Sequence, residues 1–487
     1  MTVRRVLAVV AAVAAGVSGG SAAVAAAPTE PQLRFVAAAR SVTVESYPDY
    51  GVMLDLGTHL VAGKNPFEVR LKRASYGDPI MAEQIVNGSA GKRVALPAGL
   101  VTDFAGFPAF THVTITGADG AVVLERDESL CPNSWYTTRT RPDAPDRSPY
   151  PQDCPTNPFT IGAVWGIQAG WSAPAGMPWW QAEPVDLAEG TYTATARVNQ
   201  PYRDLFGIPA DQASVTIELN VREYKDDWLR AATGANAARS GAALTPGARP
   251  AGKNSIPKNG PRPDLRSLPA WGIQIGGYED SGDRDYLSFS ATVWVAGQSP
   301  LVVDGFRRSG EDLMDAYQYF YDAKGKQTGY AQVGTMEWDA RDGHHHWHFT
   351  DFAQYRLLDE NAQLAVRSGK EAFCLANTDA VDYTLPGANW RPGNTDLHTA
   401  CGDQSSLAVR EVLDVGSGDT YGQYLPGQSF DITDLPNGTY YIEVAANPSG
   451  RLYESDTTNN TSLRKVILGG EPGARTVEVP PHQGIVG

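Results

Sequence analysis

The chain has 487 residues, of which 42% are hydrophobic and 9% aromatic. This length and composition exclude disorder along the whole chain and suffice for two or three packed domains. The formal net charge of −15 excludes a generally basic surface for nucleic acid or anionic membranes. It is compatible both with the steering of cationic partners and with simple solubility outside the cell.

The first residues have the order of a secretory signal peptide. Arg4 and Arg5 precede an apolar run rich in valine and alanine, and small residues follow this run up to Pro28. We therefore expect residues 1–27 to be a signal peptide and the mature protein to be secreted and extracellular. Later apolar runs are shorter than the roughly 18 residues that a membrane-spanning helix needs, so we expect no membrane span.

Residues 28–225 are predicted to form an N-terminal antiparallel β-sandwich domain. Runs such as THVTITGADGAVVLE and ASVTIELNV alternate apolar with polar residues and are interrupted by glycine, aspartate and asparagine. Residues 226–262 are rich in alanine, glycine and proline and are short of large apolar side chains. We predict that they form a linker that crosses the surface.

Residues 263–470 are predicted to form a second β-rich domain, followed by a tail at 471–487, so the fold class is mainly β. YQYFYDAKGKQTGYAQV indicates two strands around a glycine-containing turn. DENAQLAVRSGKEAF, at 359–373, is the place where a helix is expected. YLSFSATVWVAG predicts a half-buried strand. Its inward face would hold Leu287, Phe289, Ala291, Val293 and Val295.

The pattern D-L-x-x-G-T-Y occurs twice, beginning at Asp186 and at Asp434, and each copy precedes a strand-like run. An internal duplication would explain the repeat. A turn-and-strand solution that β-proteins reach independently would explain it as well, and we favour this second interpretation.

The four cysteines, Cys131, Cys154, Cys374 and Cys401, form an even set. In an oxidising compartment, such a set favours disulfides over free thiols. Four cysteines permit three pairings. We expect the two local ones, Cys131–Cys154 and Cys374–Cys401, because each closes a loop within one region.

The stretch RDGHHHWHFTDF contains half of the eight histidines. In an extended strand, His344, His346 and His348 would share one face, with His345 and Trp347 on the other. A solvated loop or a tag-like accident is disfavoured, because the cluster is internal and has aromatic neighbours. Three imidazoles suit zinc, copper, iron or nickel, so we expect a metal site, although the spacing alone does not choose the metal.

Known metal-site patterns narrow this choice only in part. A cupin would need a glutamate three or four residues after its second histidine, where Asp351 and Phe352 follow His348. A zinc hydrolase would need a carboxylate base nearby, and Asp342 or Asp351 would serve.

Two further blocks follow the histidine block in a specific order. HHHWHFTDFAQYRLLDENAQLAVRSGKEAFCL is followed by GDTYG and then by DITDLPNGTYYIEVAANPSGRLYESDTTNN. In order and spacing, this text resembles the catalytic domain of the lysyl oxidase family. The resemblance covers roughly Pro263 to Leu468 and does not extend to the N-terminal domain.

The resemblance implies a copper(II) site and a quinone cofactor built from the chain itself. The copper ligands would be His344, His346 and His348, and lysine tyrosylquinone would form from Lys370 and Tyr421. The family chemistry oxidises the tyrosine ring with copper and O₂ and joins the lysine amine to it. Without this joint match, Lys370 would be interpreted as a solvated lysine and Tyr421 as an ordinary turn tyrosine.

The resemblance also implies a calcium ion between the start of the domain and the E-S-D-x-x-N-N segment. Carboxylate, amide and carbonyl oxygens are the ligands that Ca²⁺ selects. The alternative is a capped acidic turn. The matching residues are Asp264, Leu265 through its backbone carbonyl, Glu454, Asp456, Asn459 and Asn460.

The chain departs from animal members of the family at Gln354, where they have a histidine, and it has fewer cysteines. A proton-transfer role for that histidine cannot be transferred. The general base is therefore unassigned, with Asp419 a candidate by its proximity to Tyr421.

The resemblance thus implies a copper amine oxidase that acts on primary amines with O₂, including lysine side chains of extracellular proteins. Its products would be an aldehyde, hydrogen peroxide and ammonia, and the N-terminal domain would position or recruit substrate. The alternative is a non-catalytic extracellular copper-binding or matrix protein that retains the fold.

Overall fold

The computed structural model describes residues 32–86, 91–176, 183–224, 244–277, 284–341, 344–368, 372–396, 400–482 and 484. In these residues the chain is mainly β, as predicted, with one α-helix, α1 (Gln200–Phe206), and one 3₁₀ turn, η1 (Ala210–Gln212). The expected signal peptide and residues 225–243 lie outside the described residues. Within the described part, no helix is long and apolar enough to cross a membrane.

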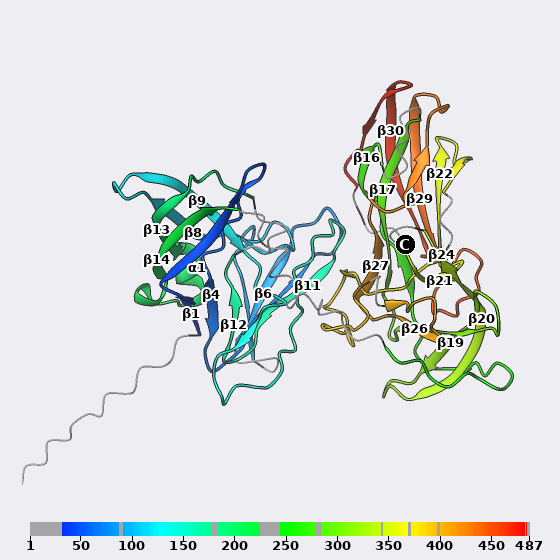
Figure 1. Cartoon of the computed structure of the whole chain (residues 1–487). Helices are drawn as coiled ribbons and strands as arrows, with labels where there is room; N and C mark the ends of the chain where they lie inside the picture. The colour runs from blue at the N-terminus through cyan, green and yellow to red at the C-terminus, as the bar shows by residue number, and fades with distance from the viewer. Residues whose placement is uncertain are drawn as a thin grey trace, which may run out of the picture.

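Three sheets build the N-terminal region (Figure 1). The first has the order β1 (Leu33–Ala37), β4 (Thr58–Ala62), β12 (Trp171–Pro174), β10 (Thr138–Arg139). The second has the order β11 (Gly162–Ile167), β5 (Phe67–Lys72), β6 (Met81–Val86), β7 (Lys92–Ala95). The third has the order β3 (Gly51–Val52), β2 (Ser41–Tyr47), β14 (Ser214–Glu223), β13 (Gly190–Val198), β8 (Phe107–Thr116), β9 (Val122–Leu130).

One apolar core lies among these three sheets. The Phe107 ring contacts that of Trp165, with centroids 4.8 Å apart, and Phe67 contacts Phe206 of α1 at 5.0 Å. The arrangement differs from the antiparallel domain that we predicted, because β2 and β14 pair in parallel, with Ser41 opposite Glu218. Alternating polarity identifies strands but says nothing about their direction, and strands far apart in sequence are free to pair in parallel.

Three further sheets build the C-terminal region. One has the order β15 (Leu265–Ser267), β17 (Tyr286–Val295), β27 (Ser417–Tyr421), β25 (Asp379–Ala380), with β16 (Trp271–Ile275) and β28 (Ser429–Asp431) also paired to β17. The next has the order β24 (Ala372–Phe373), β21 (His346–Thr350), β20 (Gln327–Asp339), β19 (Leu313–Tyr321), β18 (Leu301–Arg307), β26 (Ala408–Leu413). The last has the order β23 (Leu364–Arg367), β22 (Ala353–Asp359), β29 (Gly438–Ala446), β30 (Thr461–Glu471), β31 (Ala474–Glu478).

The predicted helix at 359–373 is wrong, because this segment begins with a hairpin. The Asp359 carboxylate accepts hydrogen bonds from the backbone nitrogens of Asn361 and Gln363, each at 2.8 Å. Ala362 has a φ of 59°, which interrupts a right-handed helix. The chain then returns as β23, which pairs with β22.

Strand β17 is buried on both faces rather than on one. Its apolar face lies in the C-terminal core, as predicted. Its other face is rich in serine and threonine but is covered as well: Trp294 packs with Phe159 and Ile161 of the N-terminal region. The side-chain amide of Asn157 also donates to Thr292 at 3.2 Å. The prediction failed because a polar strand face does not reveal that another region covers it.

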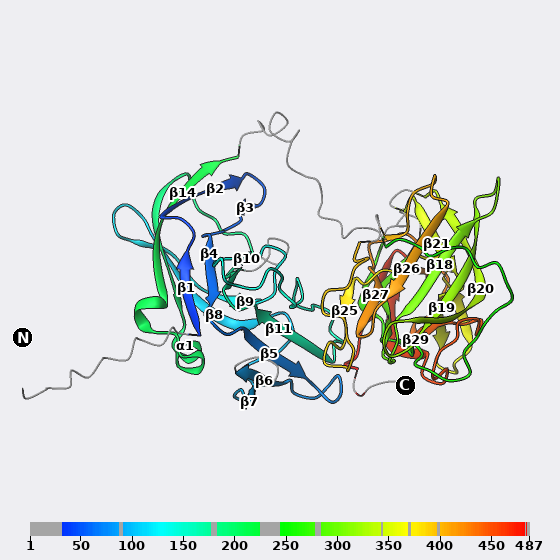
Figure 2. The same cartoon turned by 90° about the horizontal axis from the view of Figure 1, so that it is seen from below.

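The two regions are also joined through their backbones. Ile161 donates to the Val381 carbonyl at 2.8 Å, and Tyr383 donates to the Gly162 carbonyl at 3.0 Å. In Figure 2, β11 accordingly points toward β25. His482, near the C-terminal end, also contacts the N-terminal region, because its ring centroid lies 5.8 Å from that of Phe159.

The described part of the expected linker, residues 244–262, lies against the C-terminal region. The Gly247 nitrogen donates to Asp304 at 2.9 Å, Ser255 forms a bridge with Tyr330, and Arg262 lies 4.2 Å from the centre of the Phe320 ring. The expected tail at 471–487 is partly ordered as well, because β31 pairs with β30.

The D-L-x-x-G-T-Y repeat has the same local structure in both regions. In the first copy the Tyr192 hydroxyl donates to the Ala188 carbonyl, and in the second the Tyr440 hydroxyl donates to the Pro436 carbonyl, both at 2.8 Å. Each tyrosine thus fixes the turn that starts its strand, β13 or β29. This shared bond explains the pattern without requiring an internal duplication.

Candidate metal centre and tyrosine site

Three buried histidines come together at the start of β21. One ligand atom from each of His344, His346 and His348 lies within 4.8 Å of the others, which makes them the candidate metal cluster of the described residues. The ring centroids of His346 and His348 are 4.7 Å apart, and those of His344 and His348 are 5.1 Å apart. Three buried imidazoles form a donor set that fits copper.

The strand argument holds for only two of the three ligands. His346 and His348 lie in β21, whereas His344 precedes the strand in a turn, and His345 has a φ of 52°. A fully extended chain would separate residues 344 and 348 by about 13 Å. The left-handed conformation at His345 therefore brings the first ligand back to the other two, while the His345 side chain itself is exposed.

Asp339, at the end of β20, holds two of these rings. One of its carboxylate oxygens lies 3.1 Å from Nδ1 of His344 and 3.2 Å from Nδ1 of His348. Burial alone would raise the pKa of Asp339, but hydrogen bonds from His348 and Arg341 outweigh burial and lower it. A charged carboxylate behind metal-binding imidazoles fixes their orientation. The sequence analysis missed Asp339, although it lies five residues before His344.

The indole of Trp347 lies on the opposite side of β21 from its two histidine neighbours. Its ring nitrogen donates to the Asp403 carbonyl at 2.9 Å, and its backbone nitrogen donates to the Cys401 carbonyl at 3.1 Å. Trp338 packs against it with ring centroids 5.9 Å apart. These contacts fix the strand that presents His346 and His348.

Tyr421, at the end of β27, is buried in the C-terminal core. Its phenol oxygen accepts a hydrogen bond from the Cys374 nitrogen at 2.8 Å and donates one to the Cys374 carbonyl at 3.2 Å. The ring meets Phe373 edge to face, with centroids 5.1 Å apart. Phe373 belongs to β24, which pairs with β21, so the Tyr421 ring packs next to the strand that carries His346 and His348.

Two carboxyl groups contribute to the raised pKa of the Tyr421 phenol. Burial raises the pKa of the Tyr421 phenol well above its ordinary value, and nearby Asp419 raises it further, with a smaller contribution from Glu411. Both carboxyls are buried. Asp419 lies on β27 two residues before Tyr421, which places it on the same face of the strand.

Glu411 was missed by the sequence analysis. It is fully buried in β26, where its carboxylate accepts a hydrogen bond from the Leu375 nitrogen at 3.0 Å, and burial raises the pKa of this carboxyl well above its ordinary value. A signal was present, because Glu411 lies between Val409 and Leu413 at the alternate spacing of a core-facing strand.

Lys370 lies outside the described residues, as does Asp342. The described residues on both sides of Lys370 are anchored. Ser368 donates to the Tyr355 carbonyl from its backbone and to the Gly427 carbonyl from its hydroxyl, and Cys374 binds Tyr421.

Both predicted disulfides are confirmed. Cys131–Cys154 and Cys374–Cys401 have Cα separations of 5.9 and 5.8 Å.

Two other residues named in the sequence analysis are partly exposed. Asp351 forms an ion pair with Arg451 at 3.2 Å, and Gln354 is intermediate in exposure.

Most of the residues expected to bind calcium lie together. The Asn459 side chain donates to Asp264 at 3.0 Å, and the Asn460 side chain donates to Glu454 at 2.8 Å. The Leu265 nitrogen also donates to Glu454, at 3.0 Å. Asp456 is exposed and accepts hydrogen bonds from Thr458.

Comparison with known proteins gives a match to this region. Residues 317–474 match the family model described as lysyl oxidase. This range includes the histidines and Tyr421 but not Asp264 or Leu265.

Individual relatives match over a similar length. The chain is 39% identical over 125 residues to protein-lysine 6-oxidase of Homo sapiens, covering 25% of this chain and 26% of that protein. It is 37% identical over 125 residues to protein-lysine 6-oxidase of Sus scrofa, covering 25% of this chain and 44% of that protein. It is 30% identical over 130 residues to lysyl oxidase homolog 4 of Mus musculus, covering 26% of this chain and 15% of that protein.

The chain thus spans less than half the length of these curated relatives. The matched segment nevertheless contains the three buried histidines and the buried tyrosine described above. Residues 317–474 of this chain are therefore similar to the lysyl oxidase family.

Proposed function

We propose that the chain is a secreted copper-dependent amine oxidase that converts primary amines to aldehydes and releases hydrogen peroxide and ammonia. The observation that best supports this proposal is the pairing of β24 with β21, which brings the Tyr421 environment next to the histidine strand. Lysine side chains of extracellular proteins are the proposed substrate class, because the similar human and pig proteins are named protein-lysine 6-oxidase.

In this proposal His344, His346 and His348 hold copper(II), and Asp339 orients two of the rings. When bound, copper supplies with O₂ the oxidation that turns the Tyr421 ring into a quinone. The two hydrogen bonds with the Cys374 backbone keep the phenol oxygen in one orientation.

The ε-amine of Lys370 is the second component of the proposed lysine tyrosylquinone. Its free amine acts as the nucleophile that joins the Tyr421 ring. With the cofactor in place, a base would take a proton from the carbon next to the substrate nitrogen. Asp419 is our choice for this base, because it lies on the same strand face as Tyr421.

Glu411 has a different proposed role. Burial raises the pKa of its carboxyl, which favours the protonated form. Through the Leu375 nitrogen it holds the backbone next to Cys374. We therefore assign Glu411 as a positioning residue.

A calcium ion is the second proposed metal. The side-chain oxygens of Asn459 and Asn460 are buried and lack a hydrogen-bond partner in the described part of the chain. Burial raises the pKa of Glu454, and a bound cation would favour its charged form. With Asp264 and the Leu265 carbonyl, these groups offer the hard oxygen ligands that calcium prefers, whereas Asp456 would have to turn from its exposed position.

The test is hydrogen peroxide release from an alkyl amine by copper-loaded, full-length protein. We expect release that stops after treatment with phenylhydrazine, which reacts with a quinone carbonyl. Loaded protein with neither turnover nor a hydrazine adduct would favour the non-catalytic copper-binding or matrix alternative.

A second test follows the cofactor itself. Peptide mass spectrometry of aerobic, copper-replete protein should find Lys370 and Tyr421 joined in one product. Lys370→Ala should retain copper but lose the cross-link and turnover together. Lys370→Arg should fail as well, because a guanidinium stays protonated. Full turnover with both residues in separate, unmodified peptides would contradict the proposal.

A further inference from the structure

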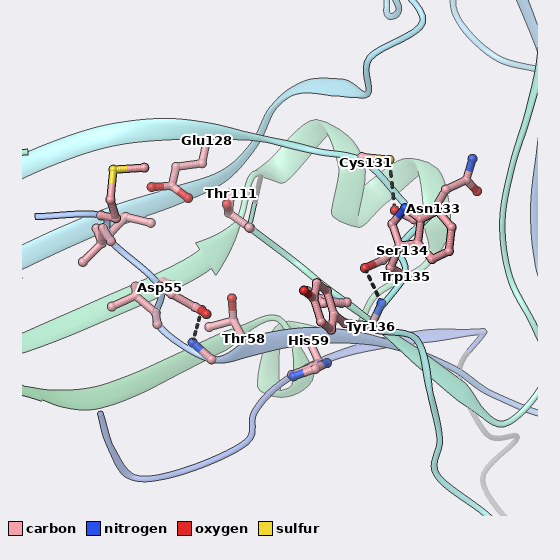
Figure 3. A pocket seen from close by; sticks show the side chains of 18 of the residues that line it. Asp55, Thr58, His59, Thr111, Glu128, Cys131, Asn133, Ser134, Trp135 and Tyr136 are labelled. Atoms are coloured by element: carbon pink, nitrogen blue, oxygen red, sulfur yellow. Dashed lines mark hydrogen bonds between the residues drawn. The ribbon is translucent and has the colours of Figure 1, made fainter. Parts of the chain in front are cut away.

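The N-terminal region contains a cavity of about 430 Å³, which is within the size range of small-molecule sites. It lies between β4 and β12 of one sheet and β8, β9 and β13 of another. In Figure 3, Thr111 and Glu128 come from β8 and β9, Asp55 comes from the segment before β4, and Trp135 and Tyr136 lie along one side.

The lining of this cavity combines three kinds of side chain. One part is apolar and includes Leu56, Val113 and Pro174. A second part is aromatic and includes His59, Trp135 and Tyr136. The third part consists of the carboxyl groups of Asp55, Glu128 and Asp153, and the lining residues include neither lysine nor arginine.

The three carboxyl groups differ in how far their charge is already balanced. Glu128 pairs with Arg126 at 2.7 Å. Asp55 is exposed and accepts a hydrogen bond from the Gly57 nitrogen at 2.8 Å. Asp153 accepts one from the Cys154 nitrogen at 2.8 Å, and no ion pair balances its charge in the described part of the chain.

The environment of Asp153 is unfavourable for its charged form. Burial raises the pKa of the Asp153 carboxyl to about 6. A partly buried carboxylate without a cation is costly, and a cationic ligand would reduce that cost.

We propose that this cavity binds a primary alkylammonium group, such as a lysine side chain or an alkyl diamine. The ammonium would lie near Asp153, its methylenes would lie against the apolar side chains, and the faces of Trp135 and Tyr136 would attract the cation. The inference rests on the proposed function, because it assigns to a separate site the amine chemistry that the C-terminal region is proposed to oxidise.

The position of the cavity suits a recruiting role. Trp135, Gln152 and Asp153 line both this cavity and a second hollow, whose other wall is in the C-terminal region and includes Thr378. The Thr378 hydroxyl in turn accepts a hydrogen bond from the Thr420 nitrogen at 2.7 Å, one residue before Tyr421. An amine held here is therefore held at the boundary between the two regions.

The experiment measures binding of N-acetyl-lysine methylamide to full-length, copper-loaded protein by calorimetry. Tyr421→Phe in every sample prevents turnover. We expect saturable binding that weakens at least tenfold with Asp153→Asn and with the uncharged probe N-acetyl-norleucine methylamide. Asp49→Asn is the matched control, because it removes the same charge at an exposed position outside the cavity lining.

Three results would overturn the inference: equal affinity in Asp153→Asn, equal affinity for the norleucine probe, or no saturable binding of the lysine probe. A neutral sugar that binds while the lysine probe does not would also overturn it. The two probes also distinguish charge recognition from a purely structural role of Asp153. A purely structural role would not make the protein bind the lysine probe more tightly than the norleucine probe.

A second arm distinguishes the source of the ammonium group. Tighter binding of a lysine-containing peptide than of 1,5-diaminopentane indicates peptidyl lysine, and the reverse order indicates free diamines. Amine oxidation by the wild type is measured separately. Turnover without cavity binding removes only this inference, and cavity binding without turnover removes only the proposed function.

Discussion

The phenol of Tyr421 is hydrogen-bonded to both the nitrogen and the carbonyl oxygen of Cys374. Cys374 is joined to Cys401, and the Cys401 carbonyl accepts a hydrogen bond from Trp347, which lies between two of the histidines. A continuous path of bonds therefore connects the tyrosine with the strand of the metal centre. Changes at one end of this path should be measurable at the other.

Tyr421→Phe should destabilise the copper-free protein as well as prevent the proposed quinone from forming. The Cys374 backbone groups are buried, and without the hydroxyl they would lose both hydrogen bonds. We expect a loss of about 1–3 kcal/mol in the free energy of unfolding, measured by chemical denaturation. Tyr424→Phe, at an exposed tyrosine, is the control and should change little.

Replacing both Cys374 and Cys401 by serine should weaken copper binding and stability together. The disulfide closes a separation of 27 residues, which in the chain-entropy model contributes about 3–4 kcal/mol. Calorimetry measures stability, and metal analysis measures copper content. Unchanged copper affinity in the double variant would show that the path from Cys401 to Trp347 does not support the metal centre.

His346→Ala removes a buried candidate ligand and should lower copper affinity by at least about tenfold. His345→Asn should retain copper, because the side chain is exposed and asparagine tolerates the left-handed conformation. Copper content after dialysis provides the measurement. If both variants keep equal copper, His346 is not a ligand.

Asp153→Asn should stabilise the protein above pH 6. The native pKa of about 6 exceeds the ordinary value of 3.8, so the native state binds more protons between these values. Stability from this group is therefore present at low pH and is lost as pH rises through that window. Unfolding at pH 4 and pH 7.5 should show a gain of about 1–2 kcal/mol at the higher pH only. A loss at pH 7.5 would contradict the assignment of an unbalanced charge.

The sequence predicted features that depend on local patterns. Two strand-like runs around a glycine-containing turn located β19 and β20, loop closure indicated both disulfides, and the histidine cluster marked the candidate metal centre. Local sequence patterns did not predict features that depend on contacts between residues far apart in the chain. The cover over the polar face of β17 comes from the N-terminal region, so alternation within β17 could not reveal it.

In the candidate site too, local patterns predicted some residues, whereas distant contacts determined the position of others. His346 and His348 follow strand spacing, but the left-handed turn at His345 that returns His344 has no signature in a run of histidines. Asp339 contacts His344 in the turn and His348 across the β20–β21 pair, and Glu411 of β26 meets Leu375 in the segment after β24. Such partners are chosen by tertiary packing rather than by spacing along the chain.

The burial of the serine- and threonine-rich face of β17 limits how the protein can be divided. The Thr292 hydroxyl lies 3.2 Å from the Asn157 side chain and 2.7 Å from the Thr420 hydroxyl, next to Tyr421. A C-terminal fragment made by cutting within 225–243 would expose Trp294 to water and remove the Asn157 amide from this network. To transplant the C-terminal region into another protein, an engineer would therefore have to include the segment around Asn157 and Ile161, or replace this surface with a new one.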